Sequence, residues 1–423
     1  MTTIRTILVL ILSVILTTCE QNKSLDAKKE IDYCIQKALI TTQSNMEEGL
    51  MPRNISRGQK NWNLTRISNW TSGYYPGILW KIYAFTGDTY WKDHARKYTR
   101  MLVPDWQTYF NRQDFAHTLM LSFGNGYAAT SDSSYYQILM KAADLVYHDV
   151  LQKTRNGERE INAFSDKLQS PFLDHILNYR LLFWAARNGE PGYFDLAVKW
   201  VDSRLPLPGT TNNLLAKRGK PGSVSSFFGQ KGFSKSGPKN TTGLSVEPVI
   251  HFSWIIYASI ITYQETQEKK YLMLAERMAE IFIQKLPPDQ IPGWSFDKNT
   301  PGYSIKDASA ATVSASAFLQ IFSLSESKHK QQFFQTAQSI LTTLSSDKYK
   351  SAETNHAFLL HSTGTDPWGG EADVSLIYTD YYYLEALLLY YQIVEKKDEE
   401  ILPLISQIKK PGLLIESAPK SHF

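Results

Sequence analysis

The sequence lacks most of the motifs and charge clusters that are typical of common enzyme classes and of nucleic-acid-binding proteins. Its 423 residues include only two cysteines, Cys19 and Cys34, so a disulfide framework is excluded. The net charge is +4 and no long Lys/Arg cluster occurs, which argues against a nucleic-acid surface. A phosphate-binding glycine loop, a dinucleotide fingerprint and a Gly-x-Ser-x-Gly motif are missing, and the nine histidines form no metal pattern. We therefore expect neither a metal nor an organic cofactor.

An apolar run near the N-terminus, residues 7–16, is too short to span a bilayer and fits the core of a signal peptide. It ends in Leu16-Thr17-Thr18-Cys19, which resembles a lipobox, where a Leu three residues before a Cys marks a lipidated N-terminus. We expect residues 1–19 to be a lipoprotein signal peptide and residues 20–28 a tether. The protein would then be exported and lipid-anchored through Cys19, at the periplasmic face of a bacterial membrane or at the cell surface. The alternative is an ordinary cleaved signal.

Helical periodicity dominates the rest of the chain. Apolar residues recur at spacings of three and four in segments 29–45, 76–86, 90–103, 136–152, 172–187, 191–204, 247–265, 270–286, 309–323, 330–346 and 379–395. Long alternating runs bounded by hairpin signals are absent, so we expect little sheet.

A weak internal repeat accompanies these segments, in which an aromatic residue is followed four residues later by alanine. Its copies are Trp91 and Ala95, Tyr193 and Ala197, Tyr271 and Ala275, and Phe333 and Ala337. The spacing places both side chains on one helix face, and the copies recur as expected if each repeat is a helical hairpin. We expect an all-α fold, an (α/α)6 toroid over residues 29–400, followed by a tail, 401–423. A plain helical solenoid fits the periodicity equally well.

One long stretch, residues 205–246, breaks the pattern, because it is rich in Gly, Pro, Ser, Asn and Lys and has no periodicity. A loop of this length within a compact domain is usually functional, and in a toroid we expect it to overhang the mouth.

Two carboxylates, Asp114 and Asp174, each interrupt an otherwise apolar helical stretch. An ionised carboxylate in apolar surroundings is costly, so it usually pairs, protonates or works as an acid or base. Paired carboxylates are also the usual equipment for sugar chemistry. Asp174 follows Pro171-Phe172-Leu173 and would alternatively serve only as a helix N-cap. Aromatics make up 13% of the chain, which suits a sugar-binding cleft or simply a large helical core.

Five stretches, taken in order, resemble the unsaturated glucuronyl hydrolases, glycoside hydrolase family 88, from about residue 60 to 395. They are residues 70–80 with 86–88; Asp114, eight residues before Ser122-Phe123-Gly124-Asn125-Gly126; Asp174 with Asn178 and Leu182-Phe183-Trp184; residues 307–310; and residues 379–387. The resemblance implies an (α/α)6 toroid. It also implies a hydrolase that removes the 4,5-unsaturated uronic acid from the non-reducing end of lyase-generated oligosaccharides.

In that chemistry an acid protonates C4 of the vinyl ether, water adds at C5, and the resulting hemiketal opens and releases the linkage. By resemblance, Asp174 is the general acid/base and Asp114 the second carboxylate that tunes it. Trp70 forms a stacking wall and Asn178 orients the sugar or Asp174. Suitable unsaturated oligosaccharides arise from glycosaminoglycans and from algal ulvan, and the sequence does not choose between them.

The sequence departs from the family where the sugar is recognised. The family's His before the first Asp is Gln113 here. Its Trp-Ala-Arg-Gly-Gln-Ala-Trp stretch lines up with residues 248–254, which keep only the final Trp254. His251, Lys217 or Arg218 would supply compensating contacts. We assign Gln113, His251 and Trp254 to substrate binding, and we read the departures as an altered substrate. Loss of activity or another reaction on the same scaffold are the alternatives.

Other functions remain open. A toroid polysaccharide lyase would abstract a proton with Tyr or His, and His117, His175 and His251 are available for this. An unsaturated rhamnogalacturonyl hydrolase would share the fold and chemistry. A surface glycan-binding lipoprotein would use the aromatics alone.

Overall fold

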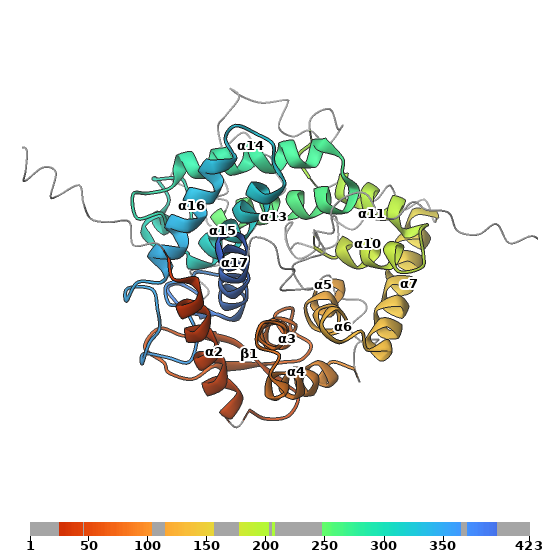
Figure 1. The fold of residues 1–423 in the computed structure, drawn as a ribbon, viewed down its shortest axis with the longest axis horizontal. Helices are drawn as coiled ribbons and strands as arrows, with labels where there is room; N and C mark the ends of the chain where they lie inside the picture. Colours follow the sequence, from red (N-terminus) through yellow and green to blue (C-terminus); the bar gives the residue numbers. More distant parts are fainter. Residues whose placement is uncertain are drawn as a thin grey trace, which may run out of the picture.

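The computed structural model describes residues 25–44, 46–103, 115–155, 177–202, 205–207, 248–364 and 370–395; for residues 149–155 it describes the backbone alone. Helices in this part of the chain alternate between an inner and an outer layer of a ring (Figure 1). The outer helices are α2 (Ala27–Gln43), α4 (Thr89–Met101), α7 (Ser133–Arg155), α11 (Tyr193–Asp202), α14 (Lys269–Lys285) and α16 (Lys330–Leu344). The inner helices are α3 (Tyr74–Thr86), the consecutive α5 (Phe115–Leu119), η1 (Met120–Gly124) and α6 (Asn125–Thr130), then α10 (Tyr179–Arg187), α13 (Val249–Thr266), α15 (Ala308–Leu324) and α17 (Ile377–Glu395).

The ring closes on itself. The last inner helix, α17, packs against α2 and α3 at the start of the chain as well as against α15. The predicted (α/α)6 toroid is therefore confirmed, and the open solenoid is excluded.

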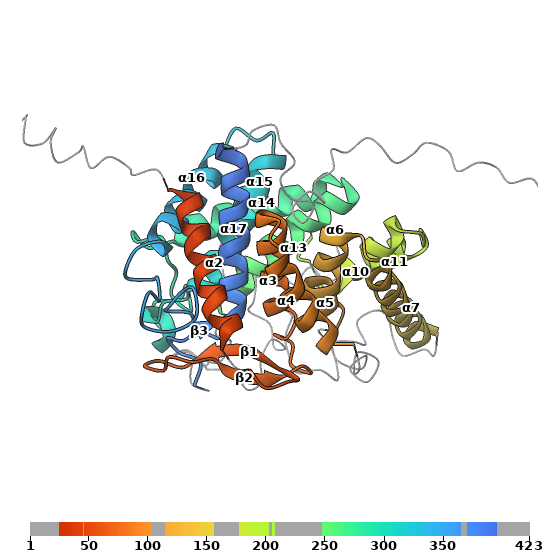
Figure 2. The ribbon, with the colours of Figure 1, turned by 60° about the horizontal axis from the view of Figure 1, so that its bottom comes forward.

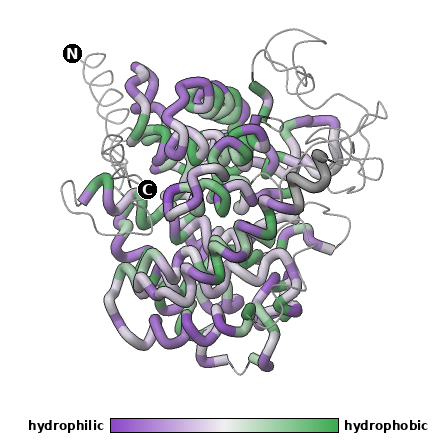
Figure 3. Tube along the Cα trace, turned by 90° about the vertical axis from the view of Figure 1, so that its right-hand side faces the viewer, coloured by the Kyte–Doolittle hydropathy of each residue, from purple (hydrophilic) through white to green (hydrophobic). Residues whose placement is uncertain are grey.

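Hydrophobic patterning separates the two layers. In α13, α15 and α17 the first fourteen residues are all buried, because an inner helix has neighbours on every side. The outer helices bury one face only, as in α4, where Trp91, Ala95, Tyr98 and Thr99 are buried. Hydrophilic and hydrophobic residues accordingly alternate along much of the chain (Figure 3).

The aromatic–alanine repeat marks the outer layer. Its four copies lie on α4, α11, α14 and α16, and all eight side chains are buried. In each copy the ring fills space between the layers, and the alanine allows an inner helix to approach closely.

Short turns join the C-terminal end of an inner helix to the next outer helix. Gly87 ends α3 with a φ of 69°, a left-handed conformation that glycine adopts without strain. The carboxylate of Asp88 then accepts a hydrogen bond from the backbone N–H of Tyr90, 2.9 Å away, and caps α4. Gln267 ends α13 in the same conformation before α14 begins. Because these tight turns lie at one end of the ring, the N-termini of the inner helices open at the other end, which we call the mouth.

A small antiparallel sheet lies beside the starts of α3 and α17 (Figure 2). Its strands are β1 (Leu50–Ile55), β2 (Asn63–Arg66) and β3 (Ser375–Leu376), in the order β2-β1-β3. The sequence predicted little sheet, and strands of two to six residues with a bulge near Pro52 leave almost no alternating pattern to read.

The sequence analysis missed the inner helix over residues 115–130. Polar residues and two glycines, Gly124 and Gly126, interrupt its apolar spacing, and residues 120–124 form a π-helix. At the N-terminus, α2 begins at Ala27, inside the stretch 20–28 predicted as a tether, because the Asp26 carboxylate caps it through the N–H of Lys29. In the described ranges no helix has both the length and the apolar character needed to cross a membrane.

Candidate active site at the mouth of the barrel

Several predicted site residues lie outside the part of the chain that the structure describes. These are Asp114, Asp174, Gln113 and Cys19, together with His175, Lys217, Arg218 and most of the loop 205–246. Their roles stay predictions. The structure does place Trp70, Asn178, His251 and Trp254. Trp70 and Asn178 lie just before the inner helices α3 and α10, whereas His251 lies in the first turn of α13 and Trp254 in its second turn.

A chain of contacts links Trp70 to Asn178 across the mouth. Trp70 is half-buried in the turn before α3, and its ring stands edge-on to Tyr74, with centroids 5.9 Å apart. The Tyr74 hydroxyl lies 3.1 Å from His117 Nε2 on α5. The backbone N–H of His117 donates to the side-chain oxygen of Asn178, 2.8 Å away, immediately before α10. Three inner helices are thereby held together where the resemblance places the sugar.

The opposite wall is aromatic and comes from α13 and α17. The rings of Trp254 and Tyr382 are 5.0 Å apart, and Tyr382 also lies 6.1 Å from Tyr74. Tyr378, one turn earlier on α17, approaches Trp70 to 5.3 Å. Two of the predicted binding residues, Trp70 and Trp254, therefore belong to one continuous aromatic cluster. Flat rings of this kind provide apolar faces together with hydrogen-bonding edges.

His117 is held neutral in this cluster. Burial, and then the positive charge of Arg180, lower its pKa to about 3. Only 3% of the residue is exposed. Because Nε2 faces the Tyr74 hydroxyl, His117 serves as a hydrogen-bonding group between α3 and α5 at any ordinary pH.

The first turn of α13 is largely apolar and buried. Ile250 and Phe252 are buried apolar side chains in the core. His251 is buried as well, three residues before Trp254 on the same side of the helix. The departures from the family pattern in this stretch thus exchange polar groups for packing.

Deeper in the barrel lies a buried ionic cluster. The Nζ of Lys81 on α3 is 3.0 Å from Glu385 Oε2 on α17. Glu385 Oε1 accepts hydrogen bonds from the hydroxyls of Tyr257 on α13, at 2.8 Å, and Ser316 on α15, at 2.7 Å. Burial alone would raise the pKa of Glu385, but Lys81 and the two hydroxyls outweigh it and the net shift is downward. Burial would likewise lower the pKa of Lys81, and Tyr381 and Glu385 reverse the shift. Both groups are therefore ionised.

Two further buried carboxylates serve the scaffold. The Asp307 Oδ1 accepts from the backbone N–H and hydroxyl of Ser309 and caps α15. Burial raises the pKa of Asp307 to about 6 in spite of these hydrogen bonds. Asp380 accepts from the N–H groups of Phe358 and Leu359, at 2.9 and 3.2 Å, and burial raises its pKa well above the usual value. Each carboxylate fixes a loop against an inner helix.

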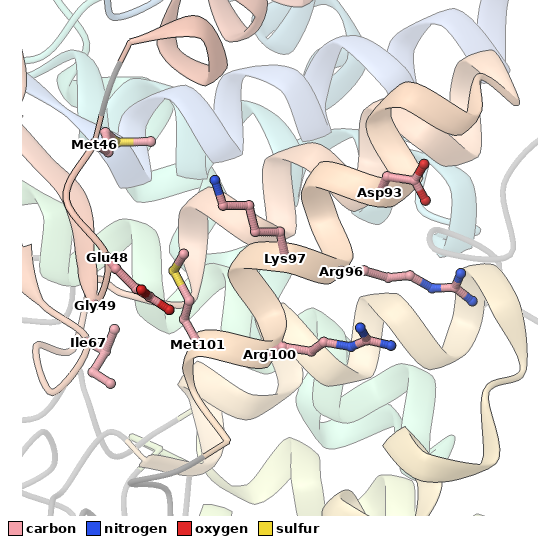
Figure 4. Close-up of a pocket in the computed structure, with 9 residues that line it drawn as sticks. All are labelled: Met46, Glu48, Gly49, Ile67, Asp93, Arg96, Lys97, Arg100 and Met101. Atoms are coloured by element: carbon pink, nitrogen blue, oxygen red, sulfur yellow. The ribbon is translucent and has the colours of Figure 1, made fainter.

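A surface pocket of about 840 Å³ lies between α4 and the residues just before β1 and just after β2 (Figure 4). Arg96 and Arg100 point together along α4, away from Glu48. None of the residues that line the pocket is a predicted site residue. Within the described ranges no group of His, Cys, Asp and Glu side chains is arranged to hold a metal ion.

A closed α/α barrel with aromatic rings and hydrogen-bonding groups gathered at its mouth is typical of carbohydrate-active enzymes. No protein-family model matches the sequence. The unsaturated glucuronyl hydrolase of Formosa agariphila is 29% identical over 345 residues, which cover 79% of this chain and 83% of that protein. The unsaturated glucuronyl hydrolase of Bacillus sp. strain GL1 is 27% identical over 374 residues, covering 84% and 95%.

Solved structures agree with these relatives. The crystal structure of an unsaturated glucuronyl hydrolase specific for heparin matches with a TM-score of 0.70 and 26% identity, and the match covers 87% of this chain and 97% of that one. Over most of its length the chain is similar in sequence and in fold to the unsaturated glucuronyl hydrolases, and it is an enzyme of the glycoside hydrolase class. The resemblance drawn from the sequence motifs is thereby confirmed.

The sequence analysis missed the ionic cluster, although the signal was present. Lys81 and Glu385 each interrupt an apolar helical run, which is the criterion that singled out Asp114 and Asp174. Tyr74 and Tyr382 carried no such signal, because tyrosine is common in helical cores.

Proposed function

We propose that this enzyme removes the 4,5-unsaturated uronic acid from the non-reducing end of lyase-generated oligosaccharides by hydrating the vinyl ether. The observation that supports this most directly is the convergence of Trp70, Asn178 and Trp254 at the mouth of a barrel shared with unsaturated glucuronyl hydrolases. Their aromatic cluster offers a stacking surface for a sugar ring, and Asn178 holds α10 against α5.

In the proposed mechanism Asp174 donates its proton to C4 while a water oxygen adds to C5, and the proton of that water passes to the Asp174 carboxylate. The C5 hemiketal then opens by cleavage of its bond to the ring oxygen. This leaves a hemiacetal at C1, which releases the remaining saccharide as an alcohol. Asp114 is the second carboxylate, and its charge keeps Asp174 protonated near neutral pH.

The test is a panel of lyase-generated unsaturated oligosaccharides, from glycosaminoglycans and from ulvan, with the ultraviolet absorbance of the conjugated double bond as readout. We expect this absorbance to fall for at least one substrate, and Asp174→Asn to abolish the fall. Absorbance that rises on saturated polysaccharides would support a lyase instead. Saturable binding with no turnover in either direction would indicate a glycan-binding protein.

We further propose that the protein is exported and held at a bacterial membrane by a lipid on Cys19. Support comes from the apolar run at residues 7–16 and the Leu-Thr-Thr-Cys sequence that follows it. In the producing bacterium, the full-length protein should label with a palmitate analogue and fractionate with membranes, and Cys19→Ala should abolish both. Labelling that survives Cys19→Ala would overturn the anchor.

A further inference from the structure

The outer helix α4 borders a cavity that the proposed mechanism does not use. The cavity has a volume of about 840 Å³, which is within the usual range of cavities that bind a small ligand. Its other described walls come from the residues just before β1 and just after β2 (Figure 4). Three cations on α4, Arg96, Lys97 and Arg100, line it together with two carboxylates, Glu48 and Asp93.

Two of these cations form a pair on one face of the helix. Arg96 and Arg100 are four residues apart, and their side chains point in the same direction (Figure 4). Like charges at this spacing repel each other, and arginine stays charged at every ordinary pH. An anion that binds between the two side chains would therefore stabilise the pair.

Within the described residues, only one carboxylate comes close to the pair. The Asp132 Oδ2 lies 3.9 Å from Nη2 of Arg96, and no carboxylate lies within 4.0 Å of Arg100. The Oδ1 of Asp132 is already engaged, since it accepts hydrogen bonds from the N–H and the hydroxyl of Ser134, at 3.0 and 2.7 Å. The Nε of Arg96 is buried and has no hydrogen-bond partner in this part of the chain. The pair thus keeps charge and donors for a ligand.

The two arginines suit an oxyanion. Each planar guanidinium can present two parallel N–H groups to a carboxylate or a sulfate. On an exposed surface one such contact contributes little, because solvent and salt screen it. A ligand that binds here must therefore make further contacts with the cavity.

The remaining walls favour a sugar over a bare anion. Met46, Ile67 and Met101 are half-buried apolar side chains, against which the C–H groups of a sugar ring can pack. The exposed carboxylates of Glu48 and Asp93 accept hydrogen bonds from hydroxyl groups, and they repel a ligand that is densely charged. The lining thus combines an anion site with the contacts that a polyhydroxylated ring needs.

We propose that this pocket binds an acidic saccharide at a second, non-catalytic site. Arg96 and Arg100 hold a carboxylate or sulfate group of the saccharide. Lys97, which points away from the pair and toward Met46, attracts a neighbouring acidic unit (Figure 4). The site keeps the enzyme on an acidic glycan between reactions. The inference goes beyond the proposed function, because binding at α4 needs no turnover and uses none of the residues assigned to the mechanism.

The experiment titrates the protein with a heparin hexasaccharide whose non-reducing end is saturated, so that it offers no double bond to hydrate. Isothermal calorimetry measures the dissociation constant. We expect Arg96→Gln/Arg100→Gln to weaken binding by roughly tenfold, through the loss of two exposed charged contacts. Added salt should weaken binding to the native protein more than to this variant. The kcat/KM for an unsaturated disaccharide should stay unchanged.

The matched control is Arg277→Gln/Lys285→Gln, which removes the same charge from exposed positions on the outer helix α14. It should leave binding unchanged. Equal losses in the two double variants would overturn the proposal, because they indicate attraction by net charge alone. Arg100→Gln by itself should weaken binding by about threefold and leave thermal unfolding unchanged. Binding that falls only in proportion to the folded fraction would refute the site.

Two further probes identify the class of ligand. Sodium sulfate should bind roughly tenfold more weakly than the hexasaccharide, because it makes no ring or hydroxyl contacts. Phosphatidylglycerol vesicles should not compete with the hexasaccharide. Sulfate that binds as tightly as the hexasaccharide, or vesicles that alone bind through the arginine pair, would overturn the assignment to a saccharide.

Activity separates this site from the mouth. Weaker hexasaccharide binding in Arg96→Gln/Arg100→Gln together with a raised KM for the disaccharide would refute a second site, because it would indicate an effect on the catalytic one. A protein that turns over no unsaturated sugar but binds the hexasaccharide through the arginine pair would support this inference while refuting the proposed function.

Discussion

The Nζ of Lys81 lies 3.0 Å from Glu385 Oε2, and this single ion pair joins the first inner helix of the ring to the last. Through its other oxygen, Glu385 also reaches α13 and α15. Four inner helices therefore meet at one carboxylate. A pair in this position fixes how the ring closes.

Removing one partner of this pair should destabilise the whole barrel. We expect Lys81→Met to lower the free energy of unfolding by about 3–5 kcal/mol, because it leaves the Glu385 charge buried without its counter-charge. The measurement is chemical denaturation at neutral pH. The control is Lys28→Met, which removes an exposed pair with Asp32 and should cost less than about 1 kcal/mol. Equal costs at the two sites would refute the importance of the buried pair.

The neutral His117 predicts a dependence of stability on acidity. Its folded pKa of about 3 lies below the ordinary value, so its contribution is complete above about pH 6.5 and is lost as the pH falls. At about pH 4 the loss should reach roughly 3 kcal/mol. His117→Gln keeps a hydrogen-bonding group toward Tyr74 and should flatten this slope, whereas the exposed His329→Gln should not. A slope that survives His117→Gln would contradict a neutral His117.

Asp307 predicts the opposite slope over part of the same range. Its folded pKa is raised to about 6, so its contribution is complete below about pH 4 and is lost as the pH rises through 6. Asp307→Asn keeps a side-chain oxygen to cap α15 and removes the ionisation. We expect the variant to gain stability relative to the native protein as the pH goes from about 4 to 7, by up to roughly 3 kcal/mol. Parallel pH curves for the two proteins would show that Asp307 titrates normally.

Close packing of α3 against its neighbours makes Gly77 intolerant of a side chain. A Cβ at this position would lie 2.8 Å from the Tyr381 ring and 2.9 Å from the carbonyl oxygen of Leu121. We expect Gly77→Ala to cost about 1–3 kcal/mol in the free energy of unfolding, because the added methyl group overpacks the contact of α3 with α17 and η1. Gly192→Ala, where nothing lies within 4 Å, is the control. Stability unchanged by Gly77→Ala would mean that the helices move apart easily.

Local sequence patterns predicted the helices well where buried residues recur at a regular spacing. The aromatic–alanine repeat identified four outer helices, because a helix with one buried face repeats its contacts at a spacing of four residues. The sequence analysis did not predict the inner helix over residues 115–130, because polar residues and glycines interrupt its apolar spacing. The strands β1 to β3 are too short to leave a pattern.

The candidate site was predictable in part. Trp70, Asn178 and Trp254 were found through motifs that resemble a known family, and the structure brings them to one mouth. The roles of Asp114 and Asp174 stay predictions. The part of the site that differs from the family was not predictable, because a substituted motif tells which groups are missing and not which groups replace them.

The sequence by itself determined most of the helical segments, which of them carry a regular outer face, and which family motifs recur in order. Only the tertiary structure decided that the ring closes and that Lys81 meets Glu385. The physical reason is the range of the interactions. Helix periodicity depends on residues that are a few positions apart in the sequence. An ion pair inside the barrel depends on side chains from distant parts of the chain, and no local pattern predicts which of them meet.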